Sequence, residues 1–141
     1  MKLTVQEVLE AAGPQGVAPV MVVEGLGFET ALKLAQMARK LEDERRTIRE
    51  RIDALRTKYE VPEKLAAIMK AHGLPKGTDE KDWPPEVAEA VNEALAAFTK
   101  EMDEFLVANI EVVVEPVAIP KDTPGVTGAM LFNVVKFVKV A

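Results

Sequence analysis

The sequence contains no cysteine and a single histidine, so much of the usual catalytic and metal-binding chemistry is excluded. Without cysteine the chain forms no disulfide, no thiolate metal site and no cysteine nucleophile. The histidine, His72, stands beside Gly73 at the expected end of a short helix, and we interpret it as structural. A glycine-rich phosphate loop and a serine-centred nucleophile elbow are also missing. Any metal site would therefore consist of carboxylates, and we expect no cofactor.

Long apolar runs are missing as well. No stretch approaches the roughly 20 apolar residues that a membrane-spanning helix needs. The first residues, MKLTVQEVLEAAG, alternate charged with apolar side chains and lack the apolar core of a signal peptide. With 48% hydrophobic and 29% charged residues, the composition is that of a folded, soluble protein. We therefore expect a cytoplasmic protein without a membrane partner.

Length and charge limit the number of domains and the kinds of binding partner. The 141 residues predict a single domain, 1–141, with room for one real core but not for two. The formal net charge of −5 disfavours a general binder of nucleic acids or anionic membranes. Abundant alanine, glutamate, arginine and valine without cysteine is a pattern that favours a thermophilic source.

A heptad pattern in residues 34–59 is the strongest structural signal of the sequence. Neither glycine nor proline occurs from residue 28 to residue 61, so we expect one long helix over 28–59. Apolar positions at alternating steps of four and three keep one side of this helix turned toward a partner helix. These positions are Leu34, Ala38, Leu41, Arg45, Ile48, Ile52, Leu55 and Tyr59.

A second helix, predicted over residues 85–108 after Pro84, is the best partner for the first. Residues 28–59 hold nine basic and six acidic residues, a balance of +3, whereas residues 85–108 hold six acidic residues and one lysine, a balance of −5. Complementary charge beside two apolar stripes favours an intramolecular antiparallel hairpin, with self-association of the long helix as the alternative. The second stripe comprises Ala88, Val91, Leu95, Phe98, Met102, Phe105 and Asn109.

Three short segments rich in valine and isoleucine predict strands near 19–23, 110–119 and 134–140. Pro116 indicates an edge position or a bulge in the second of them. Together these segments predict an α+β fold in which the long hairpin carries a small sheet of about three strands. Strand edges that do not close within the chain would be available to a strand from another subunit.

Helix ends are marked by capping signals. Thr4 and Glu7 have the spacing of a capping box, in which each side chain satisfies a free amide at the start of a helix. Residues 62–72 should form a short helix with Gly73 as its C-terminal cap. Thr127 is placed to cap a further short helix in the tail.

Four residues are candidate interface positions: Trp83, Arg45, Arg46 and Arg51. Trp83 is the only tryptophan and lies in a polar loop, where it either folds back on the end of the hairpin or is an exposed anchor for a partner. Arg45 occupies a stripe position, so it either fixes the register of the helix pair or marks where the partner helix ends. Arg46 and Arg51 lie on other sides of the same helix, among acidic residues.

Two weaker interpretations concern the charged residues. The basic run of the first helix has no interleaved aromatic side chains for stacking on bases, so nucleic-acid binding is disfavoured. The sets Glu86/Glu89/Glu93 and Glu101/Glu104 share helix faces and are able to bind a cation. Without histidines we interpret them mainly as counter-charges for the first helix, and a carboxylate-based metal enzyme is the weakest hypothesis.

The order of motifs resembles a family of small bacteriophage proteins, a phage domain of unknown function. The likeness is carried by an opening MKLT-x(3)-V, by RKLEDERRTIRERIDALRTKYEV in a long charged helix, and by FTKEMDEFLVANIEVVV, in which a helix passes into a strand. The chain departs from this pattern in its connector 73–85 and in the segment GVTGAMLF. The resemblance implies a phage origin and supplies no functional residues.

Two functional hypotheses follow. The first is a non-enzymatic phage protein that acts through protein–protein contacts as a virion or assembly component, with a phage structural protein or a second copy as partner. The alternative is a host-takeover factor that binds and modulates a host machine such as RNA polymerase. The resemblance places either protein in the cytoplasm of the infected cell, and the first also in the virion.

Overall fold

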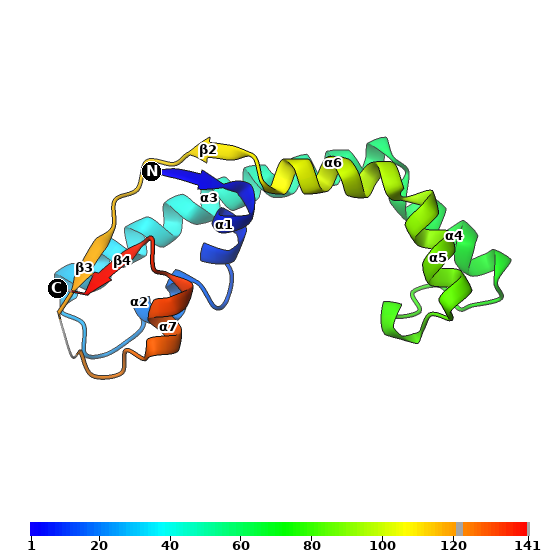
Figure 1. The fold of residues 1–141 in the computed structure, drawn as a ribbon. Helices are drawn as coiled ribbons and strands as arrows, with labels where there is room; N and C mark the ends of the chain where they lie inside the picture. Colours follow the sequence, from blue (N-terminus) through cyan, green and yellow to red (C-terminus); the bar gives the residue numbers. More distant parts are fainter. Residues whose placement is uncertain (121–122, 141) are drawn as a thin grey trace. The chain divides into compact units, whose positions relative to one another are not determined.

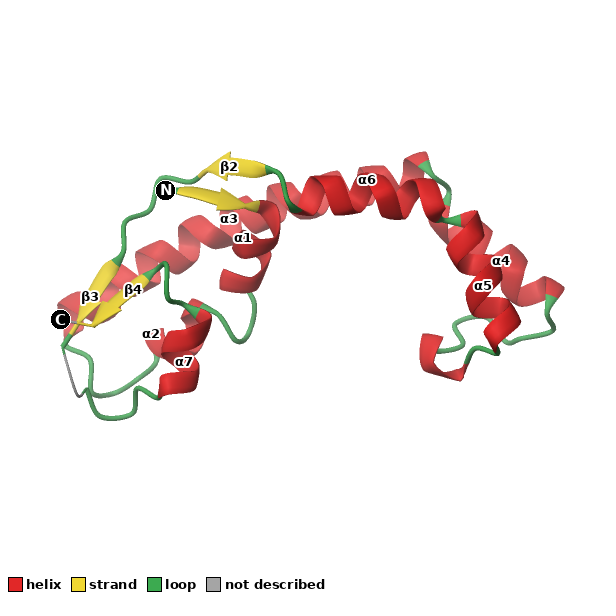
Figure 2. Ribbon diagram, in the orientation of Figure 1, coloured by secondary structure: helices red, strands yellow, loops and turns green. Residues whose placement is uncertain are grey.

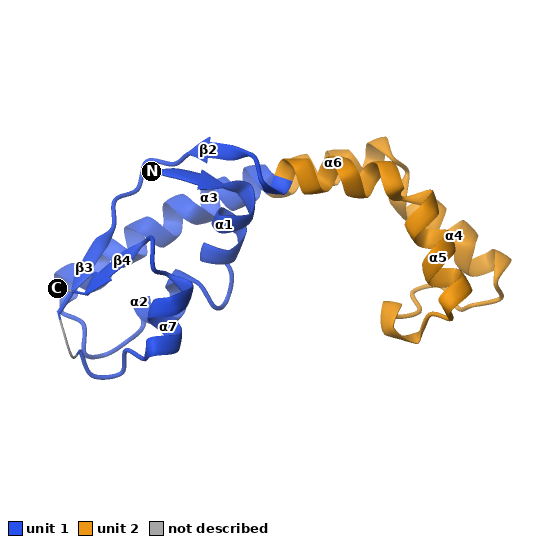
Figure 3. Cartoon of the chain, viewed as in Figure 1, with its two compact units in different colours: residues 1–48, 106–141 blue, residues 49–105 orange. Residues whose placement is uncertain are grey.

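The computed structural model describes residues 1–120 and 123–140 and combines helices with short strands (Figures 1 and 2). The predicted α+β class is confirmed at this level, and so is the long helix, α3 (Phe28–Lys58). The chain divides into two compact units: Met1–Ile48 with Leu106–Ala141, called unit 1, and Arg49–Phe105, called unit 2 (Figure 3). Helix α3 contributes to both. Folding as the single domain expected from chain length stays a prediction.

Unit 1 contains two separate two-stranded sheets. Strand β1 (Lys2–Thr4) pairs antiparallel with β2 (Asn109–Glu111), whereas β3 (Val117–Ile119) pairs parallel with β4 (Val138–Val140). The prediction of one sheet of about three strands is therefore wrong for the described residues. The first pair places the start of the chain beside residues 109–111, whereas both strands of the second pair come from the C-terminal part of the chain (Figure 1).

The predicted strand 110–119 is divided between β2 and β3 for a local reason. The amide of Val114 donates to the carbonyl of Val112 at 2.9 Å, and a bond over two residues closes a tight turn that a continuous strand cannot contain. Pro116 has no amide hydrogen, so it cannot donate a strand hydrogen bond that would join β2 and β3 into one continuous strand. Both Val112 and Val114 are nevertheless buried, so the break turns the chain without removing it from the core.

The predicted strand 134–140 is shorter than expected. The carbonyl of Val134 accepts hydrogen bonds from the amides of Phe137 and Val138, so this stretch begins as a helical turn and only Val138–Val140 extends into β4. Before it, α7 (Gly128–Asn133) starts where predicted, because the Thr127 hydroxyl accepts from the amide of Met130 at 3.2 Å.

The predicted strand 19–23 is wrong: Val17–Met21 forms a short helix, α2. Its buried residues Val17 and Val20 are three apart, which puts both on the same side of one helical turn. Pro19 is tolerated because it lies in the first turn, where the amides have no partner within the helix. The short apolar run was therefore compatible with a strand or with a helix. Burial of Val17 and Val20 in the core of unit 1 favours the helix.

The preceding helix, α1 (Val5–Ala11), confirms the predicted capping box. The amide of Glu7 donates to the Thr4 hydroxyl at 3.1 Å, and the amide of Thr4 donates to the Glu7 carboxylate at 3.0 Å. Val8 and Ala11 turn the other side of the helix into the core.

The heptad stripe of α3 is buried unequally. Every second member is almost completely buried: Leu34, Leu41, Ile48 and Leu55, at 0–4% exposure. The alternate members, Ala38, Arg45, Ile52 and Tyr59, are only half-buried. A two-sided coiled-coil interface buries both sets, so the unequal pattern indicates that helix packing accounts for only part of the burial of α3.

In unit 1 the first half of α3 packs on strands and loops. Lys33, Gln36, Met37 and Lys40 of α3 line the same hollow as residues 111–118. The long hairpin predicted between residues 28–59 and 85–108 is thus corrected for unit 1, where segments from both ends of the sequence cover α3.

Unit 2 builds its own core from helices on either side of a loop. These helices are α4 (Val61–Ala71), α5 (Pro85–Ala94) and α6 (Ala96–Leu106, whose last residue belongs to unit 1), with a short 3₁₀ turn, η1 (Glu80–Asp82), in the loop. The α4 and α5 helices pack together (Figure 1). The buried cluster comprises Val61, Met69, Val87, Val91 and Leu95.

The sequence predicted both ends of α4 and the start of α5 correctly, but neither the end of α5 nor its partner. Pro62 lies in the first turn of α4, Gly73 follows its end at φ +69°, and Pro84 and Pro85 open α5. Val91 and Leu95 of the predicted stripe, however, lie in the buried cluster with Val61 and Met69 of α4, and they share it with Val87, which the stripe did not include. The helix predicted over 85–108 is also interrupted at Leu95, without a glycine or proline that would announce the break.

A left-handed residue turns the chain from α3 into α4. Glu60 has φ 51° and ψ 43°, the only positive φ of a non-glycine residue in the described chain. Its amide donates to the carbonyl of Thr57, and its carbonyl accepts from the amide of Lys64, so it ends one helix and starts the next. A side chain in this region costs roughly 1 kcal/mol, which glycine would avoid.

Candidate interaction surfaces

A hollow in unit 1 lies between α1 and α7, and most of its lining surface is apolar. Its volume is about 850 Å³. Phe132 of α7 is 83% exposed and Val135, just beyond α7, is 73% exposed, although both border this hollow. Leu9 and Leu106 contribute further half-buried apolar surface. We call these four residues the α1–α7 groove. Exposed apolar residues that gather around a hollow are typical of surfaces that bind another molecule.

Two of the three charged residues that line this hollow, Glu7 and Lys136, neutralise each other, and the third is Glu10. Lys136 forms an ion pair with Glu7, whose other contacts cap α1. The hydrogen bond from Lys136 and the backbone bond from Thr4 hold the pKa of Glu7 below its ordinary value. A general acid or base at neutral pH needs the opposite, a carboxyl whose pKa rises toward 7. Glu7 therefore fits a structural role at the edge of a binding surface better than a catalytic one.

Trp83 is folded onto unit 2. Its indole nitrogen donates to the carbonyl of Thr78 at 3.0 Å, and its half-buried ring packs against the buried cluster of α4 and α5. The Thr78 hydroxyl in turn donates to the carbonyl of Pro75 at 2.6 Å, which ties the loop together. The structure thus takes the first of the two arrangements weighed for Trp83. Its role as an anchor for a partner stays a prediction.

The three candidate arginines are not brought together by the structure. Arg45 pairs with Glu42 on its own helix at 3.1 Å, and the described residues give it no ion pair with the second helix. Arg46 pairs with Asp43 at 3.8 Å and is 69% exposed. Arg51 is exposed as well, and the described residues give it no ion pair. Ion pairs between residues three apart on one helix form more readily than pairs between helices, because they do not depend on how a second helix is positioned.

The contact that does join α3 to α6 involves Lys58, Tyr59 and Glu101. The Lys58 ammonium lies 3.1 Å from the Glu101 carboxylate, and the Tyr59 hydroxyl donates to the same carboxylate. The Tyr59 ring also meets the Phe98 ring edge-on, with centroids 6.2 Å apart. The predicted hairpin is therefore present in a short form at this end of α3.

The electrostatics of this contact favour its charged state. The hydrogen bond from Tyr59, followed by that from Lys58, lowers the pKa of Glu101. The same carboxylate raises the pKa of the Tyr59 hydroxyl and of the Lys58 ammonium. All three groups thus keep their ordinary neutral-pH ionisation, which is typical of a structural contact and gives no indication of a reactive group. In the sequence, Tyr59 at the end of the heptad stripe was the signal for this contact between α3 and α6.

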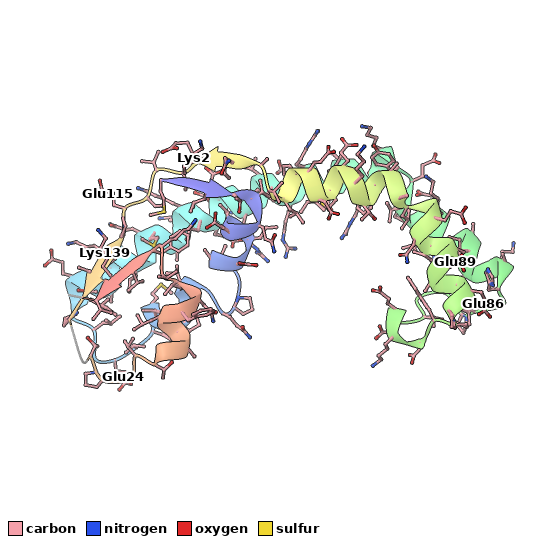
Figure 4. All side chains as sticks on the ribbon, viewed as in Figure 1. Lys2, Glu24, Glu86, Glu89, Glu115 and Lys139 are labelled. Atoms are coloured by element: carbon pink, nitrogen blue, oxygen red, sulfur yellow. The ribbon has the colours of Figure 1, made fainter. Side chains whose placement is uncertain are left out.

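The glutamates considered for a metal site do not form one cluster. Glu86 and Glu89 project from α5 (Figure 4), whereas Glu101 is engaged by Lys58 and Tyr59. Within residues 1–120 and 123–140, no three carboxylate or histidine side chains converge closely enough to hold a metal ion. The carboxylate-based metal enzyme therefore gains no support from the geometry.

The groove residues were not singled out from the sequence. Phe132 and Val135 lie in a tail that reads as helix and strand, and only the fold shows that their side chains stay outside the core.

Of the helices in the described part of the chain, none combines the length and the apolar character needed to cross a membrane. Comparisons of this chain with protein-family models, with curated proteins and with solved structures find no match.

Proposed function

We propose that this chain is a non-enzymatic protein that acts by binding another protein through the α1–α7 groove. The observation that carries the proposal is the exposure of Phe132 and Val135, at 83% and 73%, beside a hollow of about 850 Å³. Leaving two large apolar side chains in water costs free energy that a partner recovers by covering them. The neutralised Glu7–Lys136 pair at the rim suits a partner segment that is apolar at its centre.

The resemblance to small phage proteins supports a phage virion or assembly component as the setting for this binding. In that role the partner is a phage structural protein, and the chain co-purifies with particles or with their assembly intermediates. The alternative role, modulation of a host machine, places the same groove on a host protein and leaves particles free of the chain.

The test compares a groove variant with a matched surface variant. Phe132→Asp combined with Val135→Asp places two charges in the groove, and both positions are exposed, so folding should be retained. Phe28→Asp is the control, because Phe28 is 85% exposed and does not line the groove. Tagged chains are expressed during infection, and particles and soluble complexes are separated by density gradient.

We expect the wild-type chain and the Phe28 variant in fractions with a phage structural protein, and the groove variant only in fractions of free protein. Recovery of the wild type with a host protein, and never with phage proteins, would support the host-modulator alternative. Retention of the partner by the groove variant would contradict the binding site itself.

A further inference from the structure

The outer edge of β2 is an unoccupied strand edge. The carbonyl of Ala108 accepts from the amide of Val5 at 3.0 Å, and the amide of Val112 donates to the carbonyl of Met1 at 2.8 Å. Because backbone groups alternate in direction along a strand, the even-numbered residues 108–112 face β1, and the odd-numbered residues face away. Figure 1 shows β2 as the outer strand of this pair, and no other strand among residues 1–120 and 123–140 joins this sheet.

The side chains along this edge do not protect it well. Val107 is 65% exposed and Val113 is 80% exposed, one at each end of β2. Between them Asn109 and Glu111 are exposed too. Proteins usually guard an open edge with lysine, proline or a bulge, and residues 107–113 contain neither lysine nor proline. Glu111 is the only charged side chain in the segment.

We propose that this edge binds the same edge of a second copy of the chain, antiparallel and around a twofold axis at Ile110. In this register Val107 and Val113 of the second copy, which lie just beyond opposite ends of the three-residue strand, come near each other, so the exposed valines shield the ends of the ladder. Asn109 lies opposite Glu111 of the second copy, whose carboxylate accepts from its own Met1 ammonium through Oε1 at 3.0 Å and offers Oε2 to the amide donor. The two β1–β2 pairs then form one four-stranded sheet.

The register follows from the hydrogen-bonding geometry. Outward-facing residues exchange bonds in antiparallel pairs, and Asn109 with Glu111 of the second copy is such a pair on each side of the axis. Ile110 then falls at a position without backbone bonds to its counterpart, where strands approach most closely. The neighbouring twofold register, centred on Glu111, would put two carboxylates opposite each other, which is destabilising. The edge thus selects one register by charge and apolar matching.

This inference does not depend on the α1–α7 groove, since none of the residues that line the groove belongs to β2. The oligomeric state is therefore measured with purified protein alone, by sedimentation equilibrium across a concentration series. We expect a monomer–dimer equilibrium for the wild type.

Substitution of Asn109 tests the register by charge. Asn109→Glu places carboxylates opposite each other twice per dimer and should weaken dimerisation about tenfold, whereas Asn109→Lys should strengthen it. Asn92→Glu is the control, because it changes the net charge equally at an exposed position of unit 2. A wild type that stays monomeric throughout, or a dimer that responds equally to both glutamate substitutions, would overturn the proposal.

Single cysteines test the axis directly, because the chain has no cysteine of its own. Ile110→Cys places two thiols at the closest approach of the strands, about 4.5 Å between Cα atoms, which is within disulfide range. Val113→Cys lies near Val107 of the second copy and should not cross-link to its counterpart. We expect a disulfide-linked dimer for the first variant under mild oxidation and monomer for the second. The reverse result would rule out this register.

Discussion

Truncation of Val87 tests the packing of α5 on α4. Val87→Ala removes two carbon atoms from a side chain that is completely buried among Val61, Met69 and Leu95. At about 0.8 kcal/mol per buried methylene the transfer term is roughly 1.6 kcal/mol, and the cavity left behind raises the loss to about 2–3 kcal/mol. Because domains of this size are stable by only about 5–15 kcal/mol, the loss is easily measured.

Trp83 provides the signal for this experiment. It is the only tryptophan and packs against the same cluster, so its emission during urea unfolding reports on unit 2. Helical circular dichroism, followed in parallel, reports on the whole chain. The matched control is Val22→Ala, the same chemical change at a side chain that is 71% exposed in unit 1. We expect the control to change the free energy of unfolding by less than about 0.5 kcal/mol.

The outcome distinguishes packing of the second helix on α4 from pairing of that helix along α3. The heptad pattern of the sequence turns Ala88 inward, whereas the structure buries Val87 completely and Ala88 only partly. If Val87→Ala were as mild as Val22→Ala, the α4–α5 core described above would be wrong, and pairing of the second helix along α3 would again be the better account.

Three further predictions concern caps, backbone and charge. Thr4→Ala should destabilise the chain by about 1 kcal/mol in thermal unfolding, because it removes one half of the capping box, whereas Thr99→Ala on the exposed side of α6 should not. Glu60→Gly should raise the free energy of unfolding by up to about 1 kcal/mol by relieving a left-handed side chain, whereas Glu60→Val should lower it. Glu101 has a lowered pKa, so its stabilising contribution is present above its unfolded-state pKa and is lost as pH falls through the folded-state value. Urea unfolding of wild type and Glu101→Gln should therefore differ at neutral pH and converge in acid; an equal difference at every pH would refute this assignment.

The sequence predicted best the features that depend on neighbouring residues. The long helix, the capping box at Thr4 and Glu7, and the start of α4 at Pro62 follow from local rules, and the structure confirms them. The predicted strand 19–23 failed because five apolar residues fit a helical turn as well as a strand.

Pairings between distant segments were harder to predict. The half-burial of Ile52 beside the full burial of Leu55 arises from what packs on α3, and a heptad pattern treats both as equivalent. Opposite charge on the two helices suggested pairing along their whole length, yet α5 packs on α4, and the ion pair, hydrogen bond and ring contact toward α6 come from Lys58 and Tyr59 at the end of α3. Exposed surface ion pairs are too weak to override apolar packing of α5 on α4. The groove at Phe132 depends on tertiary structure and has no signature in the sequence.

The most direct test of the proposed binding site is a photo-crosslink from the groove during infection. A photoreactive phenylalanine analogue replaces Phe132 in one chain and Phe28 in another, because both side chains are more than 80% exposed. If the groove binds a phage structural protein, light should link the chain labelled at position 132 to that protein, and the chain labelled at position 28 should remain free. Equal cross-linking from both positions, or cross-linking from position 28 alone, would contradict the groove as the binding surface.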